Sequence, residues 1–301
     1  MDVPGATYRQ CDINDYDSLI RELAGFEAIV HLAAVPNPAM EPGREVFRVN
    51  DLGTFALFEA AAAHRIRRFV GASSINALGY FFGKRSFPIQ YLPVDAEHPT
   101  FATDAYSFSK QVMEDVGRYF WNRDGIASVM LRLPGVMPHA RVLELAEHGA
   151  DRIKRQRELA EEILAMPDDE RRNCLKRMHR EYDAYRATGV METPADGERP
   201  ETPPIDQKEL RLMHTKANFW AYLDDSDCAV CIEQALVAEY EGSHTMFVNA
   251  HKNLMGLDKA ELAKLFYPVV PELRGQHPGD DCLVGIDRAR TLLGFDPKYT
   301  V

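Results

Sequence analysis

Short apolar runs alternate with helical patterns along the first half of the chain. Nearly continuous apolar runs at 28–34, 68–74 and 128–133 are typical of strands that are buried on both faces. Residues 52–64 and 105–121 place their apolar side chains at helical spacing, which predicts two helices between those strands. This order of strand, helix and strand predicts a parallel sheet with crossover helices.

The pattern changes after residue 140, where charged residues dominate and apolar ones recur at helical spacing. We expect two helices between 141 and 186, broken near Pro167. Residues 189–208 are rich in glycine and proline, which predicts a long irregular connection. Further along, the pattern predicts strands at 218–223 and 245–249 and helices at 225–239 and 259–266.

Composition and charge narrow the class of protein. The 301 residues are 46% hydrophobic, but no apolar run approaches the roughly 20 residues of a membrane helix, and no signal peptide precedes the first run. We therefore expect a cytoplasmic protein without a membrane partner. The 46 acidic residues outnumber the 35 basic ones, giving a net charge of −11, which argues against nucleic acid as a partner. The basic stretch at 152–157 is followed by glutamates, so we interpret it as a solvated helix face.

The cysteines do not indicate a metal site or a disulfide framework. There are five of them, scattered over the chain. Cys228 and Cys231 have the spacing of metal ligands, but no second pair lies nearby and their surroundings are apolar. We expect them to pack in the core, and we predict no bound metal.

Two polar features point to chemistry. Tyr106 and Lys110 lie four residues apart at the start of a predicted helix, so both face the same side. A lysine beside a tyrosine lowers the pKa of the phenol, which suits proton transfer, although this spacing also fits a surface pair. Ser73 and Ser74 end a predicted buried strand, where ligand sites of parallel sheets gather.

Together with their neighbours, these residues resemble the extended short-chain dehydrogenase/reductases, the NAD-dependent epimerase/dehydratase family. The matching segments come in the family's order, although each is weak alone. They are Cys11-Asp12-Ile13, His31-Leu32-Ala33-Ala34, Asn50 with Gly53-Thr54, Ser73-Ser74, Tyr106 with Lys110, Arg132-Leu133-Pro134-Gly135-Val136 and, near the end, Leu292-Leu293-Gly294-Phe295-Asp296-Pro297.

The resemblance implies a site and a mechanism. Tyr106 would be the acid/base, Lys110 would bind the nicotinamide ribose and lower the tyrosine pKa, and Ser74, or less favourably Ser73, would hold the reacting oxygen. The implied cofactor is NAD, with NADP as an open alternative. Its implied contacts are Asp12, Ile13, Leu32, Ala33, Ala34, Asn50, Tyr106, Lys110, Pro134 and Val136.

The implied fold is α/β, a Rossmann-like doubly wound parallel sheet that is truncated at its N-terminus, with a smaller, mostly helical C-terminal substrate lobe. We expect a dinucleotide-binding domain at 1–140, a helical insert or cap at 141–215, and a substrate lobe at 216–301 with elements that return to the main sheet. Family members pair through two helices, here 52–64 and 105–121, so a homodimer is expected. Its apolar surface would come from Phe55, Phe58, Val112, Val116 and Phe120, which core burial explains equally well.

One family feature has no match in the sequence. The family begins with a strand and a glycine-rich turn that holds the pyrophosphate, and the chain enters at what resembles the third strand. Either the gene product is longer, or this is a natural protein without a full cofactor site. The two hypotheses are an NAD(P)-dependent oxidoreductase or epimerase of a sugar or sugar derivative, and an inactive binding or regulatory relative.

The residues near the site bear on the substrate. Ile75-Asn76 follows the catalytic serine where sugar-nucleotide dehydratases carry acids, and Gly135 stands where UDP-sugar epimerases usually have asparagine. The stretch from Ser73 to Gly79 is loosely similar to that of uronate dehydrogenases, which act on free sugar acids. A simple sugar dehydrogenase is therefore favoured.

Overall fold

The computed structural model describes residues 4–148, 151–195, 197–275 and 279–300. Its strands are β1 (Ala28–His31), β2 (Arg68–Ser74), β3 (Tyr91–Leu92), β4 (Ala127–Leu133), β5 (Gly135–Met137), β6 (Tyr222–Asp224), β7 (Ser243–Phe247) and β8 (Glu272–Leu273). Its helices are α1 (Tyr16–Glu22), α2 (Gly43–Phe47), the π-helical η1 (Arg48–Leu52), α3 (Gly53–Ala63), the 3-10 helix η2 (Ile75–Leu78), α4 (Ala105–Asp124), α5 (His139–His148), α6 (Asp151–Ala165), α7 (Asp168–Ala187), α8 (Gln207–Ala217), α9 (Asp225–Val237), α10 (Lys259–Phe266) and α11 (Asp287–Leu293).

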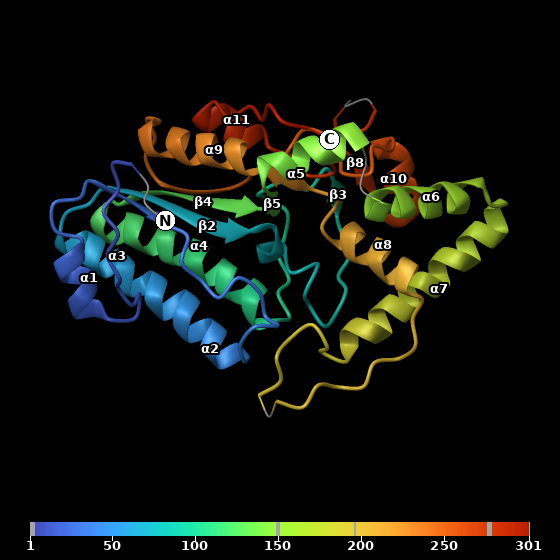
Figure 1. Cartoon of the computed structure of the whole chain (residues 1–301), viewed down its shortest axis with the longest axis horizontal. Coiled ribbons are helices and arrows are strands. Elements are labelled where there is room, and N and C mark those ends of the chain that lie inside the picture. Colours follow the sequence, from blue (N-terminus) through green and yellow to red (C-terminus); the bar gives the residue numbers. More distant parts are fainter. Residues whose placement is uncertain (1–3, 149–150, 196, 276–278, 301) are drawn as a thin grey trace.

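A four-stranded parallel sheet with the order β1-β2-β4-β7 forms the centre of the fold. Helices α1, α3 and α4 cover one face, and α9 and α11 cover the other (Figure 1). Neighbouring side chains of β2 divide between these layers, because Phe69 packs against α3 and α4 whereas Val70 packs against α9. The fold is therefore a Rossmann-like, doubly wound α/β sheet, as the sequence predicts.

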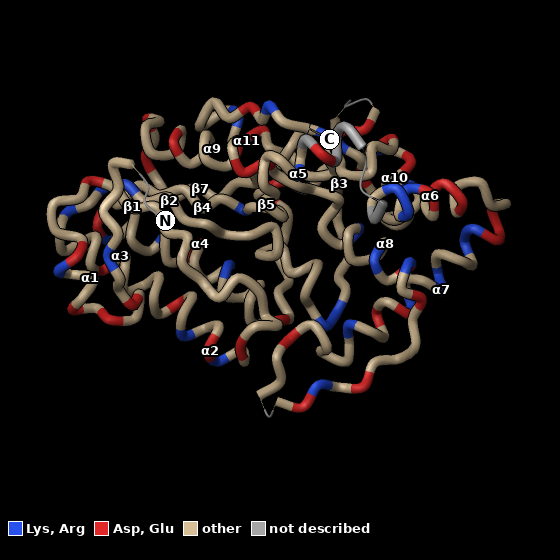
Figure 2. Tube along the Cα trace, in the orientation of Figure 1, with Lys and Arg blue, Asp and Glu red and all other residues tan. Residues whose placement is uncertain are grey.

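A second group of helices lies beside the sheet. Helices α6, α7, α8 and α10 gather at one end of the molecule (Figure 1) and share an apolar core with the segment that follows η2. Acidic and basic residues are interspersed along α6 and α7 (Figure 2), and Lys154, Arg155 and Arg157 are exposed, as expected of a solvated helix face. No helix in the described part of the chain is long and apolar enough to cross a membrane.

Several predicted elements differ from the structure. The strand expected at 28–34 ends at His31, and its residue Val30 is 39% exposed rather than buried. No described strand pairs with the outer edge of β1. Of the strand expected at 218–223, only Tyr222 and Leu223 lie in β6. Phe219 and Trp220 adopt positive φ angles of 55° and 50° in a tight turn, which a strand excludes.

Other predictions are confirmed. Helix α10 has the predicted bounds, α9 ends two residues early, and the break near Pro167 separates α6 from α7. Among the described residues between 141 and 186, α5, α6 and α7 are helical, and residues 149–150 between α5 and α6 lie outside the described part of the chain. Cys228 and Cys231 lie in the core, where burial raises the thiol pKa values to about 11 and about 12.

The apolar residues expected at a dimer surface are mostly core residues. Phe58 and Phe120 are fully buried and stack on each other, with ring centroids 5.0 Å apart, and Val116 packs beside them. Phe55 and Val112 are partly buried against the same cluster. Core burial therefore explains these residues.

Candidate active site

Strands β2 and β4 end side by side, and the candidate site lies at their carboxyl ends. Ser74 is the last residue of β2 and pairs with Leu133 of β4. Its hydroxyl accepts the backbone N–H of Asn76 at 3.1 Å and so caps η2. The same hydroxyl also hydrogen-bonds the Tyr106 side chain and thereby acts to lower the pKa of that phenol.

The start of α4 places the tyrosine and the lysine. Asp104 caps the helix by accepting the N–H of Ser107 at 2.7 Å, so Tyr106 lies in the first turn. Lys110 follows one turn later, with its Nζ 5.7 Å from the centre of the Tyr106 ring. That Nζ donates to the carbonyl of Ala72 in β2 at 2.8 Å. Helix α4 and strand β2 thereby fix both side chains.

Burial dominates the electrostatics of this pair. Burial is the main cause that raises the pKa of Tyr106 above its ordinary value, while the Ser74 hydroxyl opposes the rise. Burial also lowers the pKa of Lys110 to about 8, against the attraction of Asp51 and Glu114. Lys110 is not among the groups that act on the Tyr106 pKa here, so its role in lowering that pKa stays a prediction.

Behind the site lies a buried ion pair. Arg132 donates to both carboxylate oxygens of Glu114, at 2.9 Å and 2.8 Å, and Ser73 donates to the same carboxylate at 2.7 Å. The Ser73 hydroxyl thus donates to Glu114, whereas the Ser74 hydroxyl interacts with Tyr106. The pair links α4 to the ends of β2 and β4.

A cavity of about 340 Å³ brings many of the predicted residues together. It is bounded by the strand ends, the start of α4 and the segment after η2. Of the predicted catalytic and cofactor-binding residues, those that line it are Leu32, Ala34, Ser74, Tyr106, Lys110, Pro134 and Val136.

Other predicted residues lie outside this lining. Asn50 is buried and makes two hydrogen bonds to the backbone of Val35. Its Oδ1 accepts the Val35 N–H at 2.8 Å, and its Nδ2 donates to the Val35 carbonyl at 3.2 Å. It therefore shapes the loop after β1. Asp12 is exposed, Ile13 approaches Gly53 at the start of α3, and Ala33 is exposed. The structure does not bring these three to the cavity.

Some residues of the site were not predicted. Phe82 packs edge-on against the Tyr106 ring at 5.7 Å, and Asn218 reaches the cavity from the far half of the chain. The distance of Asn218 along the sequence gives no signal for this placement. For Glu114 the sequence did contain a signal, because this residue follows Lys110 by four positions and so lies on the same helix face.

The structure is that of an α/β protein with a cavity at the carboxyl edge of its parallel sheet. Residues 2–168 match the model of the NAD dependent epimerase/dehydratase family. That match covers more than half of the chain, so the chain belongs to this family.

Curated relatives match over shorter stretches. A uronate dehydrogenase of Pseudomonas syringae pv. tomato is 30% identical over 128 residues, 42% of this chain and 43% of the relative. An L-arabinose 1-dehydrogenase (NAD(P)(+)) of Haloferax volcanii is 33% identical over 127 residues, 40% of this chain and 50% of the relative. The chain thus spans about half the length of these relatives.

A solved structure supports the fold. A short-chain dehydrogenase/reductase superfamily protein from Agrobacterium tumefaciens with bound NAD superposes with a TM-score of 0.54 at 20% identity. The match covers 96% of this chain and 80% of that one. At this identity the likeness concerns the fold alone.

Proposed function

We propose that this protein is an NAD-dependent sugar oxidoreductase in which Tyr106 exchanges a proton with the substrate oxygen. The observation that supports this most is the convergence of Ser74, Tyr106 and Lys110 on one cavity at the strand ends. Family membership and the names of the dehydrogenase relatives point to the same class of reaction.

The residues present fit the nicotinamide end of NAD. Leu32, Pro134 and Val136 provide an apolar wall, and the buried ammonium of Lys110 provides a donor for ribose hydroxyls. NAD would supply the hydride acceptor for oxidation of a sugar hydroxyl. The described residues before β1 contain no glycine-rich turn, so we name no residue among them as a contact of the NAD pyrophosphate.

The interaction of Ser74 with Tyr106 supports a route for proton transfer. In this proposal the Ser74 hydroxyl donates to the substrate oxygen and orients it toward the Tyr106 hydroxyl. Because the pKa of Tyr106 is raised, its phenol is protonated at neutral pH and acts as the acid when a carbonyl is reduced. Oxidation needs the phenolate, so its rate should increase toward alkaline pH.

For the substrate we propose a free sugar or sugar acid. The dehydrogenase relatives are named for uronate and L-arabinose, neither of which carries a nucleotide. An epimerase activity is less favoured, because the UDP-glucose 4-epimerase relatives match over a shorter stretch, 117 residues and 31% of the relative.

The first experiment follows formation of reduced nicotinamide with glucuronate, galacturonate and L-arabinose as substrates. Tyr106→Phe should lower the rate by about 100-fold or more, because it removes the acid/base group. Tyr119→Phe on the exposed side of the same helix is the matched control and should leave the rate unchanged. Unchanged turnover in Tyr106→Phe would overturn the proposed mechanism.

The second experiment measures NAD binding by titration calorimetry. Binding without turnover on any sugar, or no binding, would favour the inactive binding or regulatory relative. We further propose a homodimer and a cytoplasmic location. Sedimentation over a range of concentrations tests the dimer, and a monomer throughout would exclude it.

A further inference from the structure

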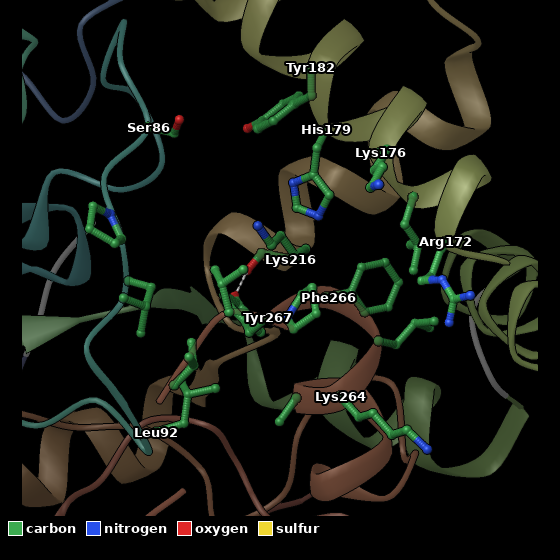
Figure 3. A pocket seen from close by; sticks show the side chains of 18 of the residues that line it. Ser86, Leu92, Arg172, Lys176, His179, Tyr182, Lys216, Lys264, Phe266 and Tyr267 are labelled. Atoms are coloured by element: carbon green, nitrogen blue, oxygen red, sulfur yellow. Dashed lines mark hydrogen bonds between the residues drawn. The ribbon is translucent and has the colours of Figure 1, made fainter. Parts of the chain in front are cut away.

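A second, larger cavity of about 1260 Å³ lies among the helices beside the sheet. Its walls come from the segment between Tyr80 and Leu92, from α7 and from the region of α10 (Figure 3). It shares no lining residue with the Ser74 cavity. The two cavities lie on either side of the aromatic run from Tyr80 to Phe82.

At its inner end the cavity holds a buried ammonium. Lys216 of α8 is 4% exposed, and its Nζ donates to the Tyr80 hydroxyl at 2.7 Å. The same Nζ lies 5.0 Å and 4.7 Å from the ring centres of Tyr80 and Tyr267. Among the described residues, no carboxylate lies within ion-pair distance of Lys216. A buried ammonium that lacks a counter-ion favours the approach of an anion.

Two further polar groups face the same space. The Tyr182 hydroxyl and the Nε2 of His179 are buried and have no hydrogen-bond partner among the described residues. Tyr182 is 2% exposed as a residue, and both side chains extend from α7 into the cavity (Figure 3). Tyr182 can donate a hydrogen bond because burial keeps its phenol protonated. Burial and Lys216 lower the pKa of His179 to about 3, so its ring is neutral and donates from Nε2 in the tautomer that carries the proton there.

The rest of the lining combines apolar walls with a basic entrance. Leu92, Leu175 and Phe266 are buried and line the interior. Six cationic and three acidic side chains line the cavity, although acidic residues outnumber basic ones in the whole chain. Lys176 and Lys264 are exposed, so positive charge also lies where a ligand would enter.

We propose that this cavity binds an amphipathic organic acid, with its carboxylate on Lys216, Tyr182 and His179 and its apolar body against the inner wall. The Lys216 side chain, the Tyr182 hydroxyl and the His179 ring all line this cavity, and each can donate a hydrogen bond to a carboxylate oxygen. The apolar walls provide the area that a hydrocarbon or aromatic group buries. This site is independent of the proposed hydride transfer.

The test is titration calorimetry of the full chain with octanoate and 4-phenylbutyrate, each compared with its neutral amide. The acids should bind at one site per chain, and the amides should bind about tenfold or more weakly. Lys216→Met should weaken acid binding by a similar factor, and Tyr182→Phe by about threefold or more. The matched controls Lys208→Met on the exposed part of α8 and Tyr185→Phe on α7 should bind as the unaltered chain does.

Several results would overturn the proposal. These are no binding of either acid at millimolar concentration, equal binding of acids and amides, or unchanged affinity in Tyr182→Phe. Circular dichroism shows whether the Lys216→Met variant is folded. If that variant is unfolded, the affinity of Tyr182→Phe for the acids decides whether the proposal holds. Tyr106→Phe should leave acid affinity unchanged, and a loss there would assign the acid to the other cavity.

Discussion

The carboxylate of Glu114 is the centre of a buried ion pair that joins α4 to two strands of the sheet. It accepts two hydrogen bonds from Arg132 and one from Ser73, and both charged side chains are less than 10% exposed. Glu114→Gln removes the negative charge but keeps the shape, so Arg132 remains buried without a counter-ion. Breaking a buried pair in this way costs about 3–5 kcal/mol. Because glutamine still offers one acceptor, we expect about 3 kcal/mol of lost unfolding free energy.

Urea denaturation at pH 7 measures this loss. The control is Asp115→Asn on the same helix, where the ion pair with Arg118 is exposed and should contribute about 1 kcal/mol or less. The double variant Glu114→Leu/Arg132→Met removes both charges and should recover most of the stability, because apolar residues often replace buried pairs at little cost. A loss in Glu114→Gln no larger than that in Asp115→Asn would refute the reasoning.

Two further stability predictions concern single positions. Burial raises the pKa of Asp51 from 3.8 to about 7. Between these two pH values the folded state keeps a proton on Asp51 that the unfolded state has lost, so the free energy of unfolding falls as the pH rises through this window. Asp51→Asn should therefore gain stability relative to the unaltered chain between pH 4 and 8, by about 1–2 kcal/mol. An unchanged difference in melting curves across that range would contradict this. Gly79→Ala should destabilise by about 2 kcal/mol or more, because φ is +85° and the added Cβ would lie 2.2 Å from the Phe101 carbonyl oxygen; Gly135→Ala, with open space around it, is the control in the same urea assay.

Local pattern was sufficient for much of the sheet and for helix α4. The apolar run at 68–74 predicted β2 with its bounds, and the helical pattern predicted α4 from its first residue. The spacing of Tyr106 and Lys110 then placed both on one face, because helix geometry fixes residues four apart. Tyr106 and Lys110 do line the same cavity as Ser74.

Apolar pattern failed where burial arises from a turn. Phe219 and Trp220 are fully buried, yet they lie between α8 and β6 with positive φ angles. A run of apolar residues reports burial, and burial is common to strands and to turns that pack inside a core. The helix α8 that precedes them was not predicted, and the irregular connection expected at 189–208 overlaps its first two residues.

The sequence by itself determined the parallel sheet, the family and the Ser74, Tyr106 and Lys110 set, because these depend on short-range periodicity and on the order of motifs. Only the tertiary structure decided what surrounds them. Glu114 meets Ser73 from 41 positions away, and Lys216 meets Tyr80 from 136 positions away. Such contacts follow from how helices pack on the sheet, and the pKa values of Tyr106 and Lys110 follow from the burial which that packing produces.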